Sequence, residues 1–391
     1  MSIIHGISIN ETSDTSGAIT VTSTAVIGIV ATADDADNST FPLDTPILIS
    51  DLTAAIGKSG KTGTLHKALI AINANVSAPV IVVRVADNKD TDALNASVIG
   101  LYDGKRTGIQ ALLSAEAATG LRPTIIGAPD LDTQPVVTAL IPIAKQLRAM
   151  IYASAVGNTV ADAIKYRANF DARELMLVWP NVIAYDSVNA KNDVFSSAAF
   201  ALGQRAAIDE SIGFNKTVSN VAISGILGLE HPISFDLTSM NSDAGLLNQS
   251  QITTVIRHNG FRFWGNRAAT SDDDYTFESA TRTHYTIIES IISGSEWAID
   301  QPLTTALIQT IVDEINNLFR TLKLKNQIIG AKCWYDTDKN SAANLAAGQL
   351  YLSYNFTPTA PNENLNITAT ITDTYYASMN SSLSSSTGTG E

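Results

Sequence analysis

Short apolar runs that alternate with helical patterns fill the chain from about residue 24 to residue 185. Four runs are rich in Val, Ile and Leu, and they lie at residues 26–30, 79–85, 124–127 and 174–179. Between them, residues 64–74 and 136–148 repeat apolar positions at helical spacing. Strands that are apolar on both sides occur in sheets covered by helices on both faces. The pattern therefore predicts an α/β domain with a mostly parallel sheet.

The pattern changes in the last third of the chain. Apolar residues recur at helical spacing between residues 303 and 325, and Pro302 precedes this helix. After it the period becomes two, which predicts half-buried strands. These strands are expected at residues 327–335, 349–356 and 365–371. A helix followed by alternating strands predicts a smaller α+β domain.

Both ends of the chain have alternating strands beside polar stretches. Ile7 and Ile9 alternate with polar neighbours before a polar stretch at residues 10–16. The Ser- and Thr-rich residues 381–391 are expected to be disordered, because they contain too little apolar surface to fold. We expect four parts, which are an extended arm at 1–20, the α/β domain at 21–250, the α+β domain at 251–364 and a strand arm with a tail at 365–391.

Composition narrows the class of protein. A chain of 391 residues exceeds the roughly 250–300 residues at which one hydrophobic core stops growing. Its apolar runs are shorter than the ~18 residues that cross a bilayer, and no secretory pattern follows Met1. We therefore expect a soluble protein made in the cytoplasm. A net charge of −13 disfavours nucleic acid and anionic membranes as partners.

Residues 55–62, Ala-Ile-Gly-Lys-Ser-Gly-Lys-Thr, fit a relaxed P-loop pattern. In a P-loop, Lys61 would contact phosphates and Thr62 would hold magnesium. The context argues against this, since residues 51–56 separate the loop from the strand before it and Gly63 delays the following helix. A surface loop between two helices is the favoured interpretation.

No other group predicts catalysis or a cofactor. The five histidines are too far apart for a helical metal pair, and the aspartate runs at 34–37 and 272–274 lack the spacing of a calcium loop. The single cysteine, Cys333, excludes an internal disulfide, and its apolar surroundings predict an inert strand thiol. We expect no enzyme activity, no cofactor and no metal site.

Residues 256–267 contain three aromatics and three arginines in a chain that is only 7% aromatic. Guanidinium groups stack on aromatic rings and bind carboxylates or carbonyls, so the segment is suited to holding surfaces together. A core strand with arginines at its edge is an alternative. Stacking on nucleic acid bases is a third, which the acidic balance disfavours.

This segment resembles the motif of contractile tail sheath proteins from temperate myophages and R-type bacteriocins, or tailocins. The similarity extends over nearly the whole chain. It includes Ile4-His5-Gly6, Phe41-Pro42-Leu43 with Pro46-Ile47-Leu48, Arg167 to Phe170 and on to Trp179-Pro180, Asp243 to Asn248, Trp297 to Asp300, and Leu345 to Tyr354.

The resemblance implies a structural subunit that polymerises as hexameric discs around an inner tail tube. Its expected partners are itself, the tube protein, and baseplate and tail terminator proteins, without nucleic acid or membrane insertion. The discs contract to drive the tube through a cell envelope, in a virion tail or tailocin particle assembled in the host bacterial cytoplasm. The α/β domain is expected to be the outer one and the α+β domain the inner one.

The resemblance also implies that both arms add strands to the sheets of neighbouring subunits. The residues expected in these arm strands are Ile7, Ile9, Leu365, Ile367 and Ile371. The basic end of the helix at 303–325 is a candidate for contact with the tube, through Arg320, Lys323 and Lys325.

Residues 256–267 are expected to form a structural joint between the domain junction and the sheet that receives the arms. The residues assigned to this joint are Arg257, Phe261, Arg262, Phe263, Trp264, Asn266 and Arg267. We expect Arg262 and Arg267 to pair with carboxylates or carbonyls, and Trp264→Ala to cost about 3 to 5 kcal/mol.

Two other functions stay open on the sequence. One is the sheath of a related contractile injection or secretion machine, and the other is a P-loop nucleotide-binding enzyme. The sequence does not separate a phage tail from a bacteriocin.

Overall fold

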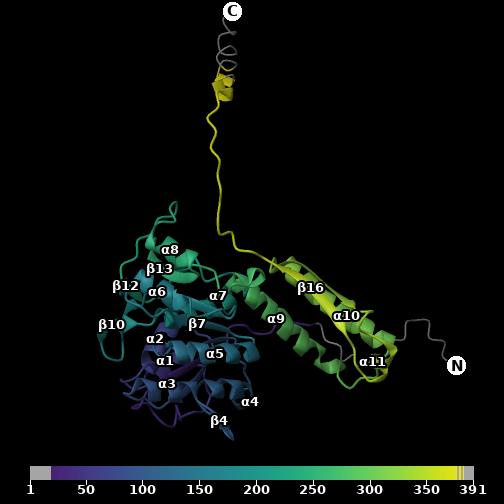
Figure 1. Cartoon of the computed structure of the whole chain (residues 1–391), viewed down its shortest axis with the longest axis horizontal. Coiled ribbons are helices and arrows are strands. Elements are labelled where there is room, and N and C mark those ends of the chain that lie inside the picture. Colours follow the sequence, from purple (N-terminus) through teal and green to yellow (C-terminus); the bar gives the residue numbers. More distant parts are fainter. Residues whose placement is uncertain (1–18, 377, 380–381, 383–391) are drawn as a thin grey trace, which may run out of the picture. The chain divides into compact units, whose positions relative to one another are not determined.

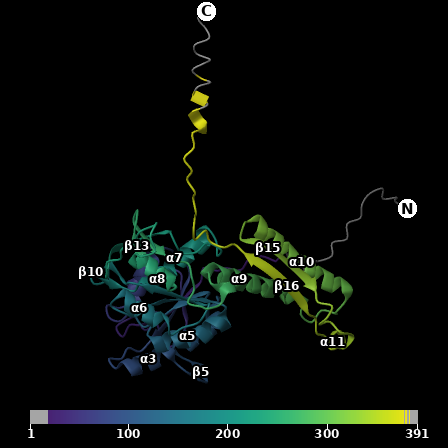
Figure 2. The same ribbon diagram turned by 45° about the horizontal axis from the view of Figure 1, so that its top comes forward.

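The computed structural model describes residues 19–376, 378–379 and 382. The chain divides into two compact units, one that ends at Pro361 and one that begins at Asn362. Figures 1 and 2 show the elements of both. Ile7, Ile9 and most of the tail at 381–391 lie outside the described residues.

A nine-stranded sheet forms the centre of the first unit. Its strands in spatial order are β11 (Ala222–Ile223), β14 (Phe261–Trp264), β13 (Ile252–Arg257), β8 (Leu175–Trp179), β7 (Met150–Ser154), β6 (Ile125–Gly127), β1 (Ile27–Thr32), β3 (Val80–Val85) and β2 (Ile47–Ile49). The six strands from β13 to β3 are parallel, and β2, β14 and β11 are antiparallel to their neighbours. The predicted mostly parallel sheet is confirmed.

Helices cover both faces of this sheet. One face holds α1 (Leu52–Ile56), α2 (Leu65–Asn73) and α7 (Ser197–Ser211); the other holds α3 (Thr91–Ile99), the 3-10 helix η1 (Gly108–Ser114), α5 (Gln134–Leu147), α6 (Val160–Arg167) and α8 (Asp243–Gln249). Along β1, Ile27 and Ile29 enter the first core and Val30 enters the second. Both faces of the strand are therefore buried, which explains its unbroken apolar run.

Smaller elements border the sheet. They are α4 (Ala115–Thr119), the β4–β5 hairpin (Tyr102–Asp103 and Lys105–Arg106), a three-stranded sheet of β10 (Lys191–Phe195), β9 (Val182–Asp186) and β12 (Ile226–Leu229), and the 3-10 helix η2 (Asp273–Tyr275). In the described part of the chain, no helix is long and apolar enough to span a membrane.

The C-terminal part of the first unit has a core of its own. Its elements are α9 (Glu278–Ser295), the 3-10 helix η3 (Glu296–Ala298), α10 (Thr305–Leu324), β15 (Ile328–Tyr335), α11 (Ala342–Ala346) and β16 (Leu352–Pro358). The antiparallel pair β15–β16 packs on α10, with Ile315, Leu318 and Phe319 in the core between them. The predicted helix at 303–325 and the predicted strands at 327–335 and 349–356 are confirmed.

Two sequence expectations differ from the structure. The boundary expected at residue 250 falls inside the large sheet, because β13 and β14 follow it and pair with β8 and β11. The strand expected at 365–371 is not formed, since the described residues of the second unit contain no strand and only residues 374–376 and their neighbours are helical. A strand needs a hydrogen-bonded partner, and these residues have none within the described part of their unit.

Candidate assembly site

The β15–β16 pair is a two-stranded sheet with an outer edge on each strand. Its inner face is buried at Ile328 and Cys333, while Ile329 is 61% exposed on the outer side. Unpaired strand edges offer N–H and C=O groups to another chain. Burial raises the pKa of Cys333, which agrees with an inert strand thiol.

The two edges are not equivalent. The side chain of Asn316 on α10 donates to the Cys333 carbonyl oxygen at 3.0 Å and accepts from the Cys333 N–H at 2.9 Å. Through these two bonds the amide takes the place that a neighbouring strand would take at this position. The outward-facing N–H and C=O groups of Cys333, in the middle of the β15 edge, are therefore already bonded. Within the described residues, no side chain makes a comparable bond to the backbone of residues 352–358. The edge of β16 is therefore the more available one for pairing with another strand.

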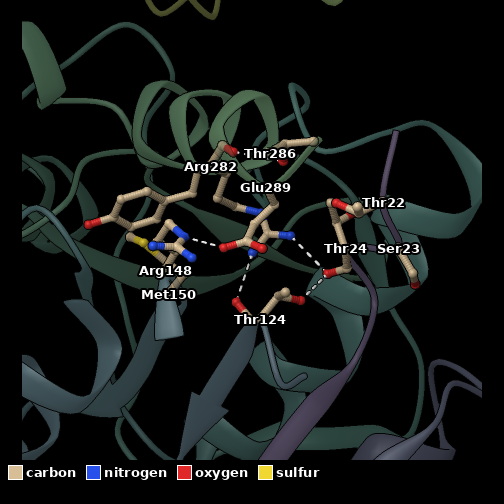
Figure 3. A pocket seen from close by; sticks show the side chains of 10 residues that line it. Thr22, Ser23, Thr24, Thr124, Arg148, Met150, Arg282, Thr286 and Glu289 are labelled. Carbon is tan, nitrogen blue, oxygen red and sulfur yellow. Dashed lines mark hydrogen bonds and ion pairs between the residues drawn. The ribbon is translucent and has the colours of Figure 1, made fainter. Parts of the chain in front are cut away.

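Residues 19–24 form an extended strap beside α9. Ile19 is buried in the core shared by α9 and α10, and Val21 packs against the same core. At the other end of the strap, Arg282 donates to the Thr24 carbonyl oxygen at 3.1 Å. Figure 3 shows this end, where Thr22, Ser23 and Thr24 lie beside the side chains of α9. The cavity there, about 20 Å³, is large enough for about one water molecule and no larger ligand.

Helix α9 connects the strap and the core of the C-terminal part to the large sheet through buried ion pairs. Arg205 of α7 contacts Glu278 at 3.0 Å and Asp209 at 2.7 Å, and all three side chains are fully buried. Arg282 also pairs with Asp209, and the hydroxyl of Tyr152 donates to Glu278. Burial alone would lower the pKa of Arg205, but Asp209 and Glu278 more than offset this and raise it.

A second group of ion pairs lies about two to three turns further along α9, at Glu289. Glu289 contacts Arg122 at 3.1 Å and also pairs with Arg148. These side chains are 17 to 26% exposed, so water screens them. The Arg148–Glu289 pair is drawn in Figure 3. The buried and the partly exposed pairs together join α9 to the α/β domain.

Helix α9 was not predicted from the sequence, because most of its buried side chains are polar. Thr283, Thr286 and Ser290 are buried, and each hydroxyl donates to the carbonyl oxygen four residues earlier at 2.7 to 2.8 Å. These local bonds satisfy the hydroxyl groups, so they can be buried at helical spacing without an apolar pattern. A search for Ser and Thr repeated at this spacing is the signal that could have found the helix.

The aromatic and arginine segment lies in the large sheet. Phe261 and Phe263 belong to the sheet core, and Phe263 is fully buried, whereas Trp264 on the opposite face is half-buried against Phe235, with ring centroids 5.0 Å apart. Arg262 donates to the carbonyl oxygens of His258 and Asn220, both at 3.1 Å, which is one of the two acceptor types expected.

The expected position of this segment between the junction and the arm-receiving sheet needs correction. Its strand partners are β8 and β11 of the large sheet, which is the core-strand alternative. Only its end reaches the junction, where Arg267 pairs with Phe277 and buried Asn266 accepts from the Glu278 N–H at 3.0 Å. The remaining member, Arg257, stacks on Phe261 with 5.8 Å between the guanidinium carbon and the ring centroid.

A sequence signal for the hairpin was missed. Asn259 and Gly260 have φ angles of 50° and 93° at the turn between β13 and β14. Asn-Gly between two apolar runs is the strongest short-range signal of a tight hairpin, because both residues tolerate positive φ. Recognising it would have placed residues 252–264 in one hairpin and moved the domain boundary beyond it.

The P-loop-like segment at residues 55–62 binds a carboxylate from elsewhere in the chain, that of Asp35. Asp35 accepts from the backbone N–H of Lys61 at 2.7 Å and from that of Thr62 at 3.1 Å, and it also binds the Thr62 hydroxyl at 2.6 Å. These hydrogen bonds lower the pKa of Asp35 to about 2, so the carboxylate is charged at neutral pH. It occupies the donors that a phosphate would need, in a loop between α1 and α2 as favoured from the sequence.

The basic end of α10 is exposed to solvent. Arg320, Lys323 and Lys325 all lie on the surface, and Leu324 between them is 85% exposed. No group of three or more His, Cys, Asp or Glu residues is placed to hold a metal ion anywhere in the described residues. Three surface features remain. They are the unpaired edge of β16, the strap at residues 19–24 and the basic end of α10.

Such features define a structural subunit that assembles with other chains through its surface. Family comparison supports this class. The phage tail sheath protein central domain matches residues 104–269, the phage tail sheath C-terminal domain matches 270–372, and the tail sheath protein Gp18 domain III N-terminal region matches 24–85. The division at 269/270 falls between β14, which ends at Trp264, and α9, which begins at Glu278.

Curated relatives agree along the whole chain. The tail sheath protein of Escherichia phage P2 is 43% identical over 97% of this chain and 98% of its own length. The major tail sheath protein of Serratia phage KSP20 is 44% identical over the same shares. The chain belongs to the phage tail sheath protein family. It is a structural sheath subunit of a contractile tail and not an enzyme.

Solved structures share the fold at low identity. The sheath of the anti-feeding prophage in its contracted state has a TM-score of 0.72 and 15% identity, covering 95% of this chain and 99% of that one. The sheath complex of the extracellular contractile injection system PVC has a TM-score of 0.71 and 18% identity, covering 96% and 99%. The mixed α/β and α+β architecture is thus a sheath fold.

Proposed function

We propose that this subunit polymerises by adding its arm strands to the inner sheets of neighbouring copies. The observation that carries the proposal is the carboxyl-terminal segment, where Leu365, Ile367 and Ile371 are 71%, 81% and 103% exposed. Their even spacing places them on one face of a strand. Exposed apolar groups in such a row mark a surface that another chain covers.

The open edge of β16 is the receiving edge that best fits an incoming arm. Strand addition takes its binding energy from main-chain hydrogen bonds and its register from alternate side chains. The contacts of Asn316 at Cys333 interrupt the edge of β15, so an arm that pairs there would have to displace them. We assign the corresponding role at the amino terminus to Ile7 and Ile9.

In the assembled tail, the copies form hexameric discs stacked around an inner tube. Open head-to-tail contacts of this kind generate helical arrays. The α/β domain faces outward, and its new contacts during contraction release the free energy that drives the tube through the envelope. Baseplate and tail terminator proteins limit the polymer at its ends. The polymer assembles in the cytoplasm of the host bacterium.

Deleting residues 2–16 is expected to abolish sheath formation and leave a folded monomer. These residues precede Ile19, the first buried residue in the described part of the chain, so the deletion removes the arm strand and leaves the core contacts of Ile19 in place. Negative-stain microscopy would show tubes for the full chain and none for the deletion. Circular dichroism and light scattering would verify the folded monomer.

Deleting residues 381–391 serves as the control, because it removes a terminal segment without an expected arm strand. Sheaths are expected to form as for the full chain. If the deletion of residues 2–16 also produces normal sheaths, the arm proposal is wrong.

We also propose that the end of α10 contacts the tube. Arg320, Lys323 and Lys325 form a basic surface in a chain of net charge −13, which suits an acidic partner. Replacing all three with Glu is expected to remove tube binding and leave empty sheaths. Co-sedimentation of tube and sheath at low and at high salt would measure this, because salt screens exposed charges.

A matched control reverses three exposed lysines of the α/β domain, Lys58, Lys89 and Lys105, and changes the net charge by the same amount. Sheaths of the control should still contain tubes. If the α10 variant co-sediments with tubes as the control does, the tube contact lies elsewhere.

The sheath of an injection or secretion machine is the second candidate. Its support is the fold shared with the two injection-system sheaths at 15 to 18% identity. Identities of 43 and 44% to phage tail sheath proteins favour the phage-type tail.

A further inference from the structure

Ile19 lies in a notch on α9 that exists because residue 294 is glycine. A Cβ atom at Gly294 would lie 2.5 Å from Cγ1, 2.6 Å from Cγ2 and 2.9 Å from Cβ of Ile19. These distances are shorter than any van der Waals contact, and they involve the branch point of Ile19, which cannot rotate away. Any side chain at position 294 therefore displaces Ile19.

Glycine is a costly choice at this position by local criteria. Gly294 lies in the last turn of α9, and its φ angle is outside the left-handed region that favours glycine. Most other residues would stabilise the helix more than glycine does at such a position. Backbone conformation therefore gives no reason for glycine here. The close approach of Ile19 gives that reason.

The two ends of the strap are attached to α9 at positions that a straight segment can join. Ile19 meets Gly294 and the Thr24 carbonyl meets Arg282, so the strap runs antiparallel to α9. Five extended residues span about 17 Å. Twelve helical residues rise about 18 Å. The two lengths are similar, which fits a strap that runs in extended form between its two attachments.

We propose that the Ile19–Gly294 contact is the anchor from which the amino-terminal arm leaves the subunit. The anchor fixes the starting point and the free length of the arm, and so it selects which neighbouring copy the arm strand can reach. The inference rests on the arm exchange proposed above and adds a positioning pair to it. Without the anchor, the next attachments are Val21 in the same core and then the Thr24 carbonyl at Arg282, so the tether gains two to five residues, about 7 to 17 Å.

A longer tether weakens each link between subunits. The effective concentration of an arm strand at its receiving edge falls once the linker exceeds the span. The released residues must also be ordered again or left slack at every link in the polymer. Both effects act on assembly and not on the fold of the large sheet.

The test compares Gly294→Val with Ser293→Val in the full chain. Ser293 is exposed on the same turn of α9, so its variant changes the helix in the same way without meeting the strap. We expect Gly294→Val to raise the protein concentration needed for sheath formation by about tenfold or more. Ser293→Val should assemble as the unchanged chain does, and sedimentation with negative-stain microscopy measures both.

Ile19→Asp and Thr20→Asp repeat the test from the side of the strap, so the result does not depend on the folding of α9 variants. Ile19 is 9% exposed and Thr20 is exposed, so only the first substitution expels the strap. Normal assembly of both Gly294→Val and Ile19→Asp overturns the anchor. If the deletion of residues 2–16 abolishes sheaths in the same assay, arm exchange stands and only the anchor is wrong; if that deletion assembles normally, arm exchange itself is wrong.

Discussion

Glu278→Ala is expected to lower the free energy of unfolding by about 3 to 5 kcal/mol. Glu278 is fully buried and contacts the equally buried Arg205 at 3.0 Å. Removing the carboxylate leaves part of the guanidinium charge without compensation, and it also removes the acceptor of the Tyr152 hydroxyl. Burial, with the Glu278 charge as the next contribution, raises the pKa of Tyr152, so this phenol stays neutral and cannot replace the lost charge.

Because Glu278 starts α9, the loss should first release the C-terminal domain from the large sheet. Denaturant unfolding followed by circular dichroism measures the free energy, and an early transition would show release of α9. Glu278→Gln keeps the volume and one acceptor, so it should cost less than Glu278→Ala.

Glu289→Ala is the matched control on the same helix. Glu289 also pairs with arginines, Arg122 and Arg148, but these groups are partly exposed. Its loss should cost no more than about 1 kcal/mol. Equal losses for Glu278→Ala and Glu289→Ala would mean that burial does not determine the strength of this junction.

Phe263→Ala is expected to cost about 3 to 5 kcal/mol, and Trp264→Ala only about 1 to 2 kcal/mol. The two residues are neighbours in β14, so their side chains point to opposite faces. Phe263 is fully buried in the sheet core, whereas Trp264 is half-buried against Phe235. This reverses the expectation from the sequence, which assigned the large loss to Trp264.

Thermal and denaturant unfolding of both variants would measure the difference. Phe263→Leu keeps most of the volume and should cost less than about 1.5 kcal/mol. A greater loss for Trp264→Ala than for Phe263→Ala would mean that β14 has the opposite register.

The sequence predicted elements best where apolar side chains repeat with a clear period. The buried strands β1, β3, β6 and β8 were recognisable because both of their faces lie against helices. Helix α10 was recognisable because Ile311, Ile315 and Leu318 form one apolar stripe. In these cases the local pattern and the tertiary environment agree.

Prediction failed where polar groups are buried or where an alternating segment has no strand partner among the described residues. Most buried side chains of α9 are polar and its hydroxyl groups bond to its own backbone, so only a short apolar stripe, Ile287 and Ile291, marks the helix. The segment at 365–371 has the alternating pattern of a strand but forms none among the described residues. An alternating pattern predicts which side chains would share a face of a strand. It does not show whether a neighbouring strand is present to pair with.

The sequence by itself determined the layered α/β architecture, the C-terminal helix with its two strands and, through resemblance, the sheath family. Only the tertiary structure decided which charged groups meet, such as Arg205 and Glu278, which are 73 residues apart. It also decided that Ile19 fits against Gly294. Periodicity records the face that each residue presents, whereas contacts between distant residues depend on how the elements pack in three dimensions.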